Sequence, residues 1–327
     1  MKRRNFFGAA AAAVMILLLS FPRLSLEGAR NGLLLWYQTV LPTLLPFMIC
    51  TNLVVSMNGV GFLTAPIAPL LKRLLGISDS GCFVLLGGML CGYPMGAKNC
   101  SEFLSQGCLS LPEARCLYAV SSFPSPMFLA GYMMAKASQS AGTALLVPLW
   151  KMAAAVYLPI FPMFYLASLL YGFHLESLKL QDKNGKAHRK AARTLSESVS
   201  RFPSLSLDEA LMSSIEIMVK IGGYLMMFSI LARFLKLLPI ASPKLTCLLV
   251  SAAEMTTGME ETSKAVSGLS GVRMILAAGA FGGFSGVFQV KSVTKNAGLS
   301  IRHYILWKIL HCGLACLILT LLLAFPR

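Results

Sequence analysis

The stretch CGYPMGAKNCSEF, Cys91 to Phe103, places two glycines, a proline, a lysine and a glutamate inside a long apolar run. It follows Cys82 to Leu90, which is apolar but far shorter than the roughly 20 residues of a membrane-spanning helix. A half-span, GYPMG and then polar-studded NCSEFLSQG together predict a re-entrant helical hairpin, which enters the membrane and leaves by the same face. Non-helical backbone at that depth needs protein or a water-filled cavity to supply its hydrogen-bond partners. The hairpin therefore predicts a cavity.

The composition places this hairpin in a membrane protein. Of 327 residues, 56% are hydrophobic and 13% are charged, which is about half the charged share of ordinary soluble domains. We expect an all-α, polytopic membrane protein, located in the cell membrane. Four segments are long and apolar enough to cross a bilayer: Leu33 to Met57, Thr143 to Phe173, Ile215 to Leu238 and Ile305 to Phe325.

The net charge of +16 is concentrated in two segments. Lys2, Arg3 and Arg4 precede the first apolar run, and a basic linker follows at 174–206. This pattern predicts that both segments, and hence the N-terminus, are cytoplasmic. Phe202 is the single Phe, Tyr or Trp of the linker, so the aromatic residues of a nucleic-acid groove are missing. Nucleic acid is excluded as a partner, and anionic lipids are the expected neighbours.

The first apolar run, Phe6 to Phe21, fits a cleaved signal peptide or an uncleaved span. An uncleaved span is favoured because it leaves both basic segments on the cytoplasmic side. Residues 1–32 are then an N-terminal transmembrane anchor.

A broken helix follows the hairpin. The segment from Leu111 to Met134 is interrupted by SSFPSP, Ser121 to Pro126, and two prolines there free several backbone groups from helical hydrogen bonds. The second half of the chain has the same order. A half-span, Leu245 to Ala253, runs into a polar tip, EMTTGMEETSK at 254–264, and Val272 to Val290 is interrupted by GGFSG.

The two halves align with one gap. Gly96 matches Gly258 at an offset of 162 residues, and Phe123 matches Phe284 at 161. We therefore divide the chain into a first repeat at 33–173, the linker at 174–206 and a second repeat at 207–327. Because each repeat starts from the opposite side of the membrane, the repeats are inverted. Inverted repeats with Gly- and Pro-interrupted segments are typical of secondary transporters, whose site lies at the midplane.

The candidate binding residues come from the tips and the breaks. Glu254 is the strongest, because a charge at the bilayer centre costs at least about 2.5 kcal/mol. Glu260 belongs to the site or pairs with Lys264 at a shallow level. Lys98 pairs with Glu102, faces an anionic substrate or replaces a coupling cation. Phe123 and Phe284 either stack on a planar ring of the substrate or serve as core aromatics. The full set of predicted substrate-binding residues is Gly92, Tyr93, Pro94, Gly96, Lys98, Ser122, Phe123, Ser125, Glu254, Thr257, Gly258, Glu260, Phe284, Ser285 and Gln289.

Enzymatic and metal chemistry is not expected. The nine cysteines contain no CxxC pair, and the chain has no Walker loop and no Ser-His-Asp order. His311, Cys312 and Cys316 share a helical spacing, which we interpret as packing in an apolar span. We predict no catalytic residue, no metal site and no cofactor.

At GYPMGAK, SSFPSPMF, EMTTGMEE and GGFSGVF the sequence resembles the YlbJ-type sporulation integral membrane proteins of the nucleoside-recognition, or Gate-domain, family. The resemblance extends from about Leu33 onward. It implies a kinship with the gates of ferrous-iron transporters and with concentrative nucleoside transporters, in which two hairpin tips and two broken helices enclose the substrate. The Gln-Thr-Glu tip of the nucleoside carriers is missing here, which argues against a nucleoside as the substrate.

These features predict an integral membrane transporter or gated pore for a small polar or anionic solute, and the resemblance implies a role in spore formation, at the spore cortex. One alternative is a non-transporting assembly protein that docks partners on the basic linker. Another is a metal-ion gate, for which Cys91 lies beside the first tip. The partners expected are the solute and anionic lipids, while a coupling ion and self-association are left open.

Overall fold

The computed structural model describes residues 2–57, 59–142, 147–173, 206–294 and 298–324, without the side chains of residues 2–7 and Ala10. These residues form α-helices and two short π-helical stretches, and no strand occurs among them. The all-α prediction is confirmed. Apart from Ser206, the predicted basic linker lies outside the described residues.

Five helical segments are long and apolar enough to cross a membrane, which supports the prediction of a polytopic membrane protein. Two are single helices, α15 (Leu207–Leu235) and α20 (Ile301–Ala324). The other three combine consecutive helices: α2 (Pro22–Leu35), η1 (Trp36–Val40) and α3 (Leu41–Ser56); α11 (Leu149–Tyr157) and α12 (Ile160–Leu170); α18 (Gly268–Phe281) and α19 (Gly283–Val293).

The first long span begins earlier than the sequence predicted. Helix α1 (Lys2–Ser20) ends before Phe21, and α2 starts at Pro22, a residue suited to the first turn of a helix. The expected boundary at residue 32 therefore falls inside α2. Gly28 and Gly32 mark close packing there, since a Cβ atom on either would lie 2.7 Å from a backbone Cα atom of α15.

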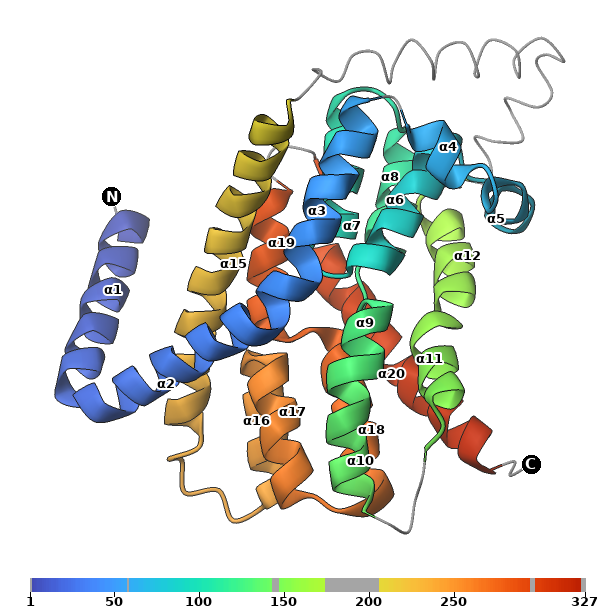
Figure 1. Ribbon diagram of the computed structural model, residues 1–327. Helices are drawn as coiled ribbons and strands as arrows, with labels where there is room; N and C mark the ends of the chain where they lie inside the picture. Colours follow the sequence, from blue (N-terminus) through green and yellow to red (C-terminus); the bar gives the residue numbers. More distant parts are fainter. Residues whose placement is uncertain (1, 58, 143–146, 174–205, 295–297, 325–327) are drawn as a thin grey trace, which may run out of the picture.

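Two helical hairpins enter the bundle from opposite ends (Figure 1). We define the upper face as the end where α12 finishes and α15 begins, and the lower face as the other end. Hairpin 1, made of α6 (Asp79–Cys91) and α7 (Met95–Ser105), descends from the upper face. Hairpin 2, made of α16 (Pro243–Ala253) and α17 (Met255–Ala265), rises from the lower face. On the upper face, α4 (Val60–Thr64) and α5 (Ala68–Leu75) precede hairpin 1, and α5 meets α6 at 105°.

Two helices are broken at mid-height. Helix α8 (Leu111–Val120) stops at Ser121, and the chain continues to the lower face as α9 (Pro126–Phe128), η2 (Leu129–Met133) and α10 (Met134–Ala141). We call the non-helical residues 121–125 break 1. The helices α18 and α19 meet at break 2, Gly282 and Gly283, whose φ angles of +86° and +66° are disfavoured for side-chain-bearing residues.

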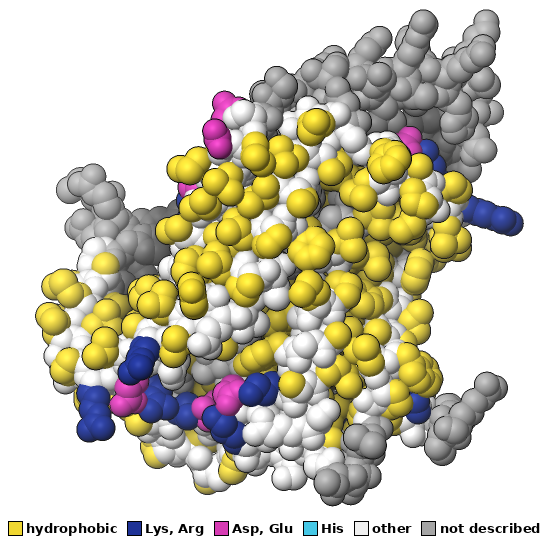
Figure 2. Space-filling model, in the orientation of Figure 1, with side chains coloured by type: hydrophobic (Ala, Val, Ile, Leu, Met, Phe, Trp, Pro, Cys, Tyr) yellow, Lys and Arg dark blue, Asp and Glu magenta, His cyan; other side chains and the backbone are white. Residues whose placement is uncertain are grey.

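Many large apolar side chains are exposed, and they are spread over the face of the molecule that Figure 2 shows. Charged side chains gather in a band near the lower face in the same view. An apolar surface of this extent fits a hydrocarbon environment, in which lipid tails cover the side chains that water would cover in a soluble protein. The hairpin tips and the breaks lie inside this surface, near the middle of the bundle.

Candidate functional site

The tip of hairpin 1 consists of Gly92, Tyr93 and Pro94 and is shorter than the predicted GYPMG tip, because α7 already begins at Met95. Gly92 has a φ of +76°, and a Cβ atom there would lie 2.9 Å from the amide nitrogen of Ser125. The Tyr93–Pro94 peptide bond is cis. The tip therefore rests directly on the backbone of break 1.

Two glycines in the arms of hairpin 1 enclose the backbone of break 1. A Cβ atom on Gly88 would lie 2.1 Å from the Ser121 carbonyl oxygen, and one on Gly96 would lie 1.8 Å from it. Gly96 thus lies on α7, above the tip, where it contacts Ser121. Small residues serve here to bring two backbones together.

The tip of hairpin 2 is shorter than predicted. The chain turns at Glu254, and the stretch from Met255 to Ala265 is already the returning helix α17. Glu254 is fully buried, and its carboxylate accepts hydrogen bonds from the amides of Thr256 and Thr257, at 3.1 and 2.6 Å, and from the Thr256 hydroxyl at 2.6 Å. Glu254 is therefore the N-cap of α17, and these local bonds satisfy the buried charge that made it the strongest sequence candidate.

Each tip also contacts the opposite half of the chain. The Tyr93 hydroxyl donates to the carbonyl oxygens of Gly279 and Ala280, at 3.3 and 3.1 Å, at the end of α18. The Tyr132 hydroxyl, on η2, donates to the carbonyl oxygen of Thr256 at 3.0 Å. Both tips and both breaks thus converge on one region.

A cavity of about 40 Å³ lies in this region. It has room for a few water molecules, since one occupies roughly 10–15 Å³ on the same measure, but not for a metabolite-sized solute. Gly92, Tyr93, Ser125 and Gln289 are the predicted residues that line it. The remaining lining residues are Val40, Thr43, Leu44, Cys91, Pro124, Phe128, Ile221, Leu225, Met255 and Thr256.

The predicted aromatic pair does not face this cavity. The Phe123 side chain is 1% exposed and packs edge-on against Tyr157, so it is a core aromatic. Phe284 is 44% exposed and lies on the outer side of α19. Phe123 lies in break 1 and Phe284 in the first turn of α19, directly after break 2, but neither is placed to stack on a bound ring. On the inner side of α19, Ser285 is buried and accepts a hydrogen bond from the Gln289 amide nitrogen at 3.1 Å.

Lys98 lies on α7 and takes part in a polar network. Its ammonium group pairs with Glu102 at 2.8 Å and donates to the Asn52 amide oxygen at 3.1 Å. The Asn52 amide nitrogen in turn donates to the Ser214 hydroxyl at 3.0 Å. Of the roles considered for Lys98 in the sequence analysis, the structure shows the ion pair with Glu102. The network joins hairpin 1 to α3 and α15.

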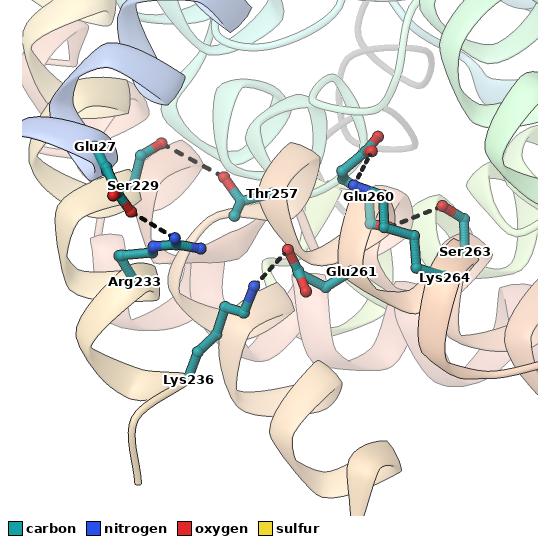
Figure 3. Close-up of polar contacts among 9 residues, drawn as sticks. All are labelled: Glu27, Ser229, Arg233, Lys236, Thr257, Glu260, Glu261, Ser263 and Lys264. Carbon is teal, nitrogen blue, oxygen red and sulfur yellow. Dashed lines mark hydrogen bonds and ion pairs between the residues drawn. The ribbon is translucent and has the colours of Figure 1, made fainter. Parts of the chain in front are cut away.

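The descending arm of hairpin 2 carries three other predicted residues. A Cβ atom on Gly258 would lie 2.2 Å from the Ser251 Cα atom, so a glycine at this position lets the two helices of hairpin 2 pack closely against each other. The Thr257 hydroxyl lies 3.4 Å from that of Ser229 on α15. Glu260 pairs with Lys264 at 2.6 Å (Figure 3). Lys136 also contacts the Glu260 carboxylate.

Hairpin 2 is thus held by ion pairs on both sides. Lys136 reaches Glu260 from α10, and Lys236 reaches Glu261 from α15 at 2.7 Å. Glu260 lies outside the helices long enough to span a membrane. Burial raises its pKa, but hydrogen bonds from Lys136 and Lys264 outweigh this effect and lower the pKa below its usual value.

Sequence reasoning missed Lys308, which lies on α20 and is 1% exposed. Its ammonium nitrogen donates to the carbonyl oxygen of Ser122 in break 1 at 2.7 Å and lies 4.6 Å from the centre of the Tyr93 ring. A lysine within an apolar span is a signal of function, and Lys308 lies inside the predicted span Ile305 to Phe325, so this signal was available in the sequence. The Ser122 contribution to the site is consequently a backbone carbonyl.

No group of three His, Cys, Asp or Glu side chains suited to a metal occurs among the described residues. His311 instead contacts the Val156 carbonyl oxygen at 2.8 Å, and the Cys316 thiol donates to the Arg273 carbonyl oxygen at 3.8 Å. These contacts give His311 and Cys316 packing and hydrogen-bonding roles within the bundle.

Comparison with known proteins gives one relative. No family model matches the sequence, and no solved structure matches it. The chain is similar to the sporulation integral membrane protein YlbJ of Bacillus subtilis (strain 168), with 26% identity over 229 residues. The match covers 66% of this chain and 53% of YlbJ, so it spans about half the length of that relative.

Proposed function

We propose, from this sequence relationship, that the chain is a YlbJ-type sporulation membrane protein and that it is a transporter or gated pore for a small polar or anionic solute. The observation that carries the proposal is one cavity, lined by the tip of hairpin 1, by break 1, by the first turn of α17 directly after the tip of hairpin 2, and by Gln289 on the helix that follows break 2. Such an arrangement is typical of transporters built from inverted repeats.

The cavity supplies suitable polar groups. Ser125, Thr256 and Gln289 bring side-chain donors and acceptors to it. Each polar group at this depth costs free energy unless it has a partner. Water fills that role in the small cavity described here, and a polar solute fills it when the cavity widens.

Alternating access follows from the placement of the hairpins. Hairpin 1 stands between the cavity and the upper face, which we assign to the cytoplasm with the N-terminus, and hairpin 2 stands between the cavity and the lower face. Moving one hairpin at a time opens the cavity to one side. Because the cavity volume is about 40 Å³, such a movement is required before a solute enters.

The test is solute movement in vesicles. The purified full chain is screened for binding of nucleosides, dicarboxylates and divalent ions, and the compounds that bind are tested for uptake into proteoliposomes. The Gln289→Leu variant approximately preserves side-chain size and removes the amide from the cavity. It is expected to reduce uptake strongly, with a small loss of Tm because the hydrogen bond to the buried Ser285 is also removed. Phe284→Leu, on the outer side of the same helix, is the matched control. Equal uptake by Gln289→Leu and wild type would remove the cavity from the mechanism.

A role in spore formation is part of the proposal and rests on the relationship with YlbJ. The chain is expected to restore heat-resistant spores to a Bacillus subtilis strain that lacks YlbJ. Restoration by a Gln289→Leu variant that no longer moves solute would favour the non-transporting assembly protein. Deletion of Asp182 to Arg193 then tests whether the basic linker docks the partners of such an assembly.

A further inference from the structure

Lys308 is a buried cation in the first half of a helix that is long and apolar enough to span a membrane. It is 1% exposed and lies within the apolar helix Ile301–Ala324. Among the described residues it forms no ion pair, whereas Lys98, a buried lysine of hairpin 1, pairs with Glu102. An ionisable group at such a position is expensive, and its retention indicates a use.

Neutral acceptors surround the ammonium group. Its nitrogen lies 2.7 Å from the Ser122 carbonyl oxygen, 3.3 Å from the Nδ1 atom of His311 and 4.6 Å from the centre of the Tyr93 ring. The His311 Nε2 atom lies 2.8 Å from the Val156 carbonyl oxygen. Because a carbonyl oxygen can only accept a hydrogen bond, Nε2 carries the proton of a neutral imidazole, and Nδ1 accepts from Lys308. Each of the three ammonium protons therefore has an acceptor: a carbonyl, an imidazole or an aromatic face.

The geometry joins three separate parts of the fold. Ser122 belongs to break 1, where interruption of the helix leaves carbonyl oxygens without intrahelical partners. Tyr93 belongs to the tip of hairpin 1, and its hydroxyl group binds the end of α18. In transporters with discontinuous helices, carbonyl oxygens freed in this way coordinate Na⁺ or H⁺.

We propose that Lys308 is a built-in cation at break 1, which fills the position that a bound metal cation takes at such breaks and so holds hairpin 1 on break 1 without a metal ion. The sequence analysis considered cation replacement for Lys98, whose ammonium is bound to Glu102 and Asn52 instead. For the transport reaction, the consequence is independence from Na⁺. That consequence rests on the proposed function, while the cation site itself does not.

The first experiment needs no knowledge of the solute. Lys308→Ala in the full chain vacates the ammonium position and is expected to lower the Tm of the detergent-purified protein. Methylammonium or ethylammonium, which are N–H donors of matching size, are expected to restore most of the lost Tm, whereas tetramethylammonium, which has no N–H group, is not. Lys151→Ala is the matched control, because Lys151 is also buried and donates to a single carbonyl oxygen, that of Leu322, at 2.8 Å. It is expected to gain nothing from the small amines.

Absence of rescue in Lys308→Ala, or equal rescue in the Lys151 control, would overturn the built-in cation. If Lys308→Ala does not fold, Lys308→Met decides, since it has nearly the same length and no charge. If the Tm of Lys308→Met equals that of the wild type, the ammonium group does not stabilise the contact between hairpin 1 and break 1. If the Tm of Lys308→Met is reduced and that of Lys308→Arg lies between the two, the proposal is supported.

The second experiment tests the coupling consequence in proteoliposomes. Replacement of Na⁺ by choline is expected to leave solute uptake by the wild type unchanged. Under the same conditions, solute uptake by Lys308→Ala is expected to depend on added small ammonium ions. If wild-type uptake requires Na⁺, the inference that Lys308 replaces a coupling metal ion is wrong. Absence of any solute movement in the wild type would count against the proposed function alone, because the Tm experiment reads the cation site independently.

Discussion

The two hairpins share a design but differ in how deeply they are embedded. In hairpin 1, ten of the 13 residues of α6 and eight of the 11 residues of α7 are buried. In hairpin 2, four of the 11 residues of α16 and five of the 11 residues of α17 are buried. Hairpin 1 is therefore part of the core, and hairpin 2 is an element attached to it from outside.

The charged residues of the hairpins show the same contrast. Lys98 and Glu102 on α7, and Glu260 and Lys264 on α17, form ion pairs four residues apart. The pairs lie at one offset, 260 − 98 = 162 and 264 − 102 = 162, with opposite polarity. Lys98 is buried and binds Asn52, whereas Glu260 is partly exposed and receives Lys136 at the surface. Because exposed ion pairs contribute little, hairpin 2 is the hairpin that moves at the smaller cost in free energy.

The largest expected effect comes from filling the contact between hairpin 1 and break 1. Gly96→Val is expected to destabilise the protein by more than about 3 kcal/mol or to prevent folding, because its side chain would collide with the Ser121 carbonyl. Gly258→Val collides with Ser251 inside hairpin 2 and is expected to cost less, since the two arms can separate at the periphery. Thermal unfolding in detergent measures both.

Gly286→Val is the control for these substitutions, because no atom lies within 4 Å of a Cβ atom at Gly286. It is expected to change the Tm little. A larger loss for Gly258→Val than for Gly96→Val would reverse the assignment of hairpin 1 to the core.

Removal of the cap of α17 is expected to have an intermediate effect. Glu254→Ala deletes three hydrogen bonds from a fully buried position and leaves two amides without an acceptor, which costs about 1–3 kcal/mol. Hydrogen exchange is expected to increase in hairpin 2 and to stay unchanged in hairpin 1. Ser263→Ala, which removes a bond within α17, is the control, and uniform exchange in both hairpins would contradict the local role of Glu254.

The hairpins and breaks were predictable because two constraints act locally. An apolar segment too short to span must turn back, and Gly and Pro determine where a helix stops. The extent of tip 2 was not predictable in the same way, since a single residue, Glu254, makes the turn and the polar residues after it form a helix. Lys308 contacts Ser122 across 186 residues of sequence, so its partner is fixed by tertiary packing alone. The outward orientation of the Phe284 side chain likewise depends on how α19 packs against its neighbouring helices.

A smaller effect is expected from the ion pairs of hairpin 2. Lys136→Gln and Lys236→Gln are each expected to cost about 0.2–1 kcal/mol, less at high salt, and to increase hydrogen exchange in α17. Lys220→Gln is the control, because Lys220 pairs with Glu216 on α15 and not with a hairpin. If neither substitution changes exchange in α17, the pairs do not hold hairpin 2 in place.

The smallest effect concerns pH and again separates the hairpins. Because the pKa of Glu260 is lowered in the folded protein, its ion pairs stabilise the fold above the ordinary pKa of a glutamate, about 4.3, and this contribution is lost as the pH falls through the lowered value. The Tm difference between wild type and Lys136→Gln is therefore expected to be constant near neutral pH and to shrink as the solution becomes more acidic than the ordinary glutamate pKa. A difference that stays constant over this range would show that Lys136 acts by packing on α10 and not by its charge. Hairpin 2 would then be attached by apolar contacts, as hairpin 1 is, and the contrast between the two hairpins would be one of depth alone.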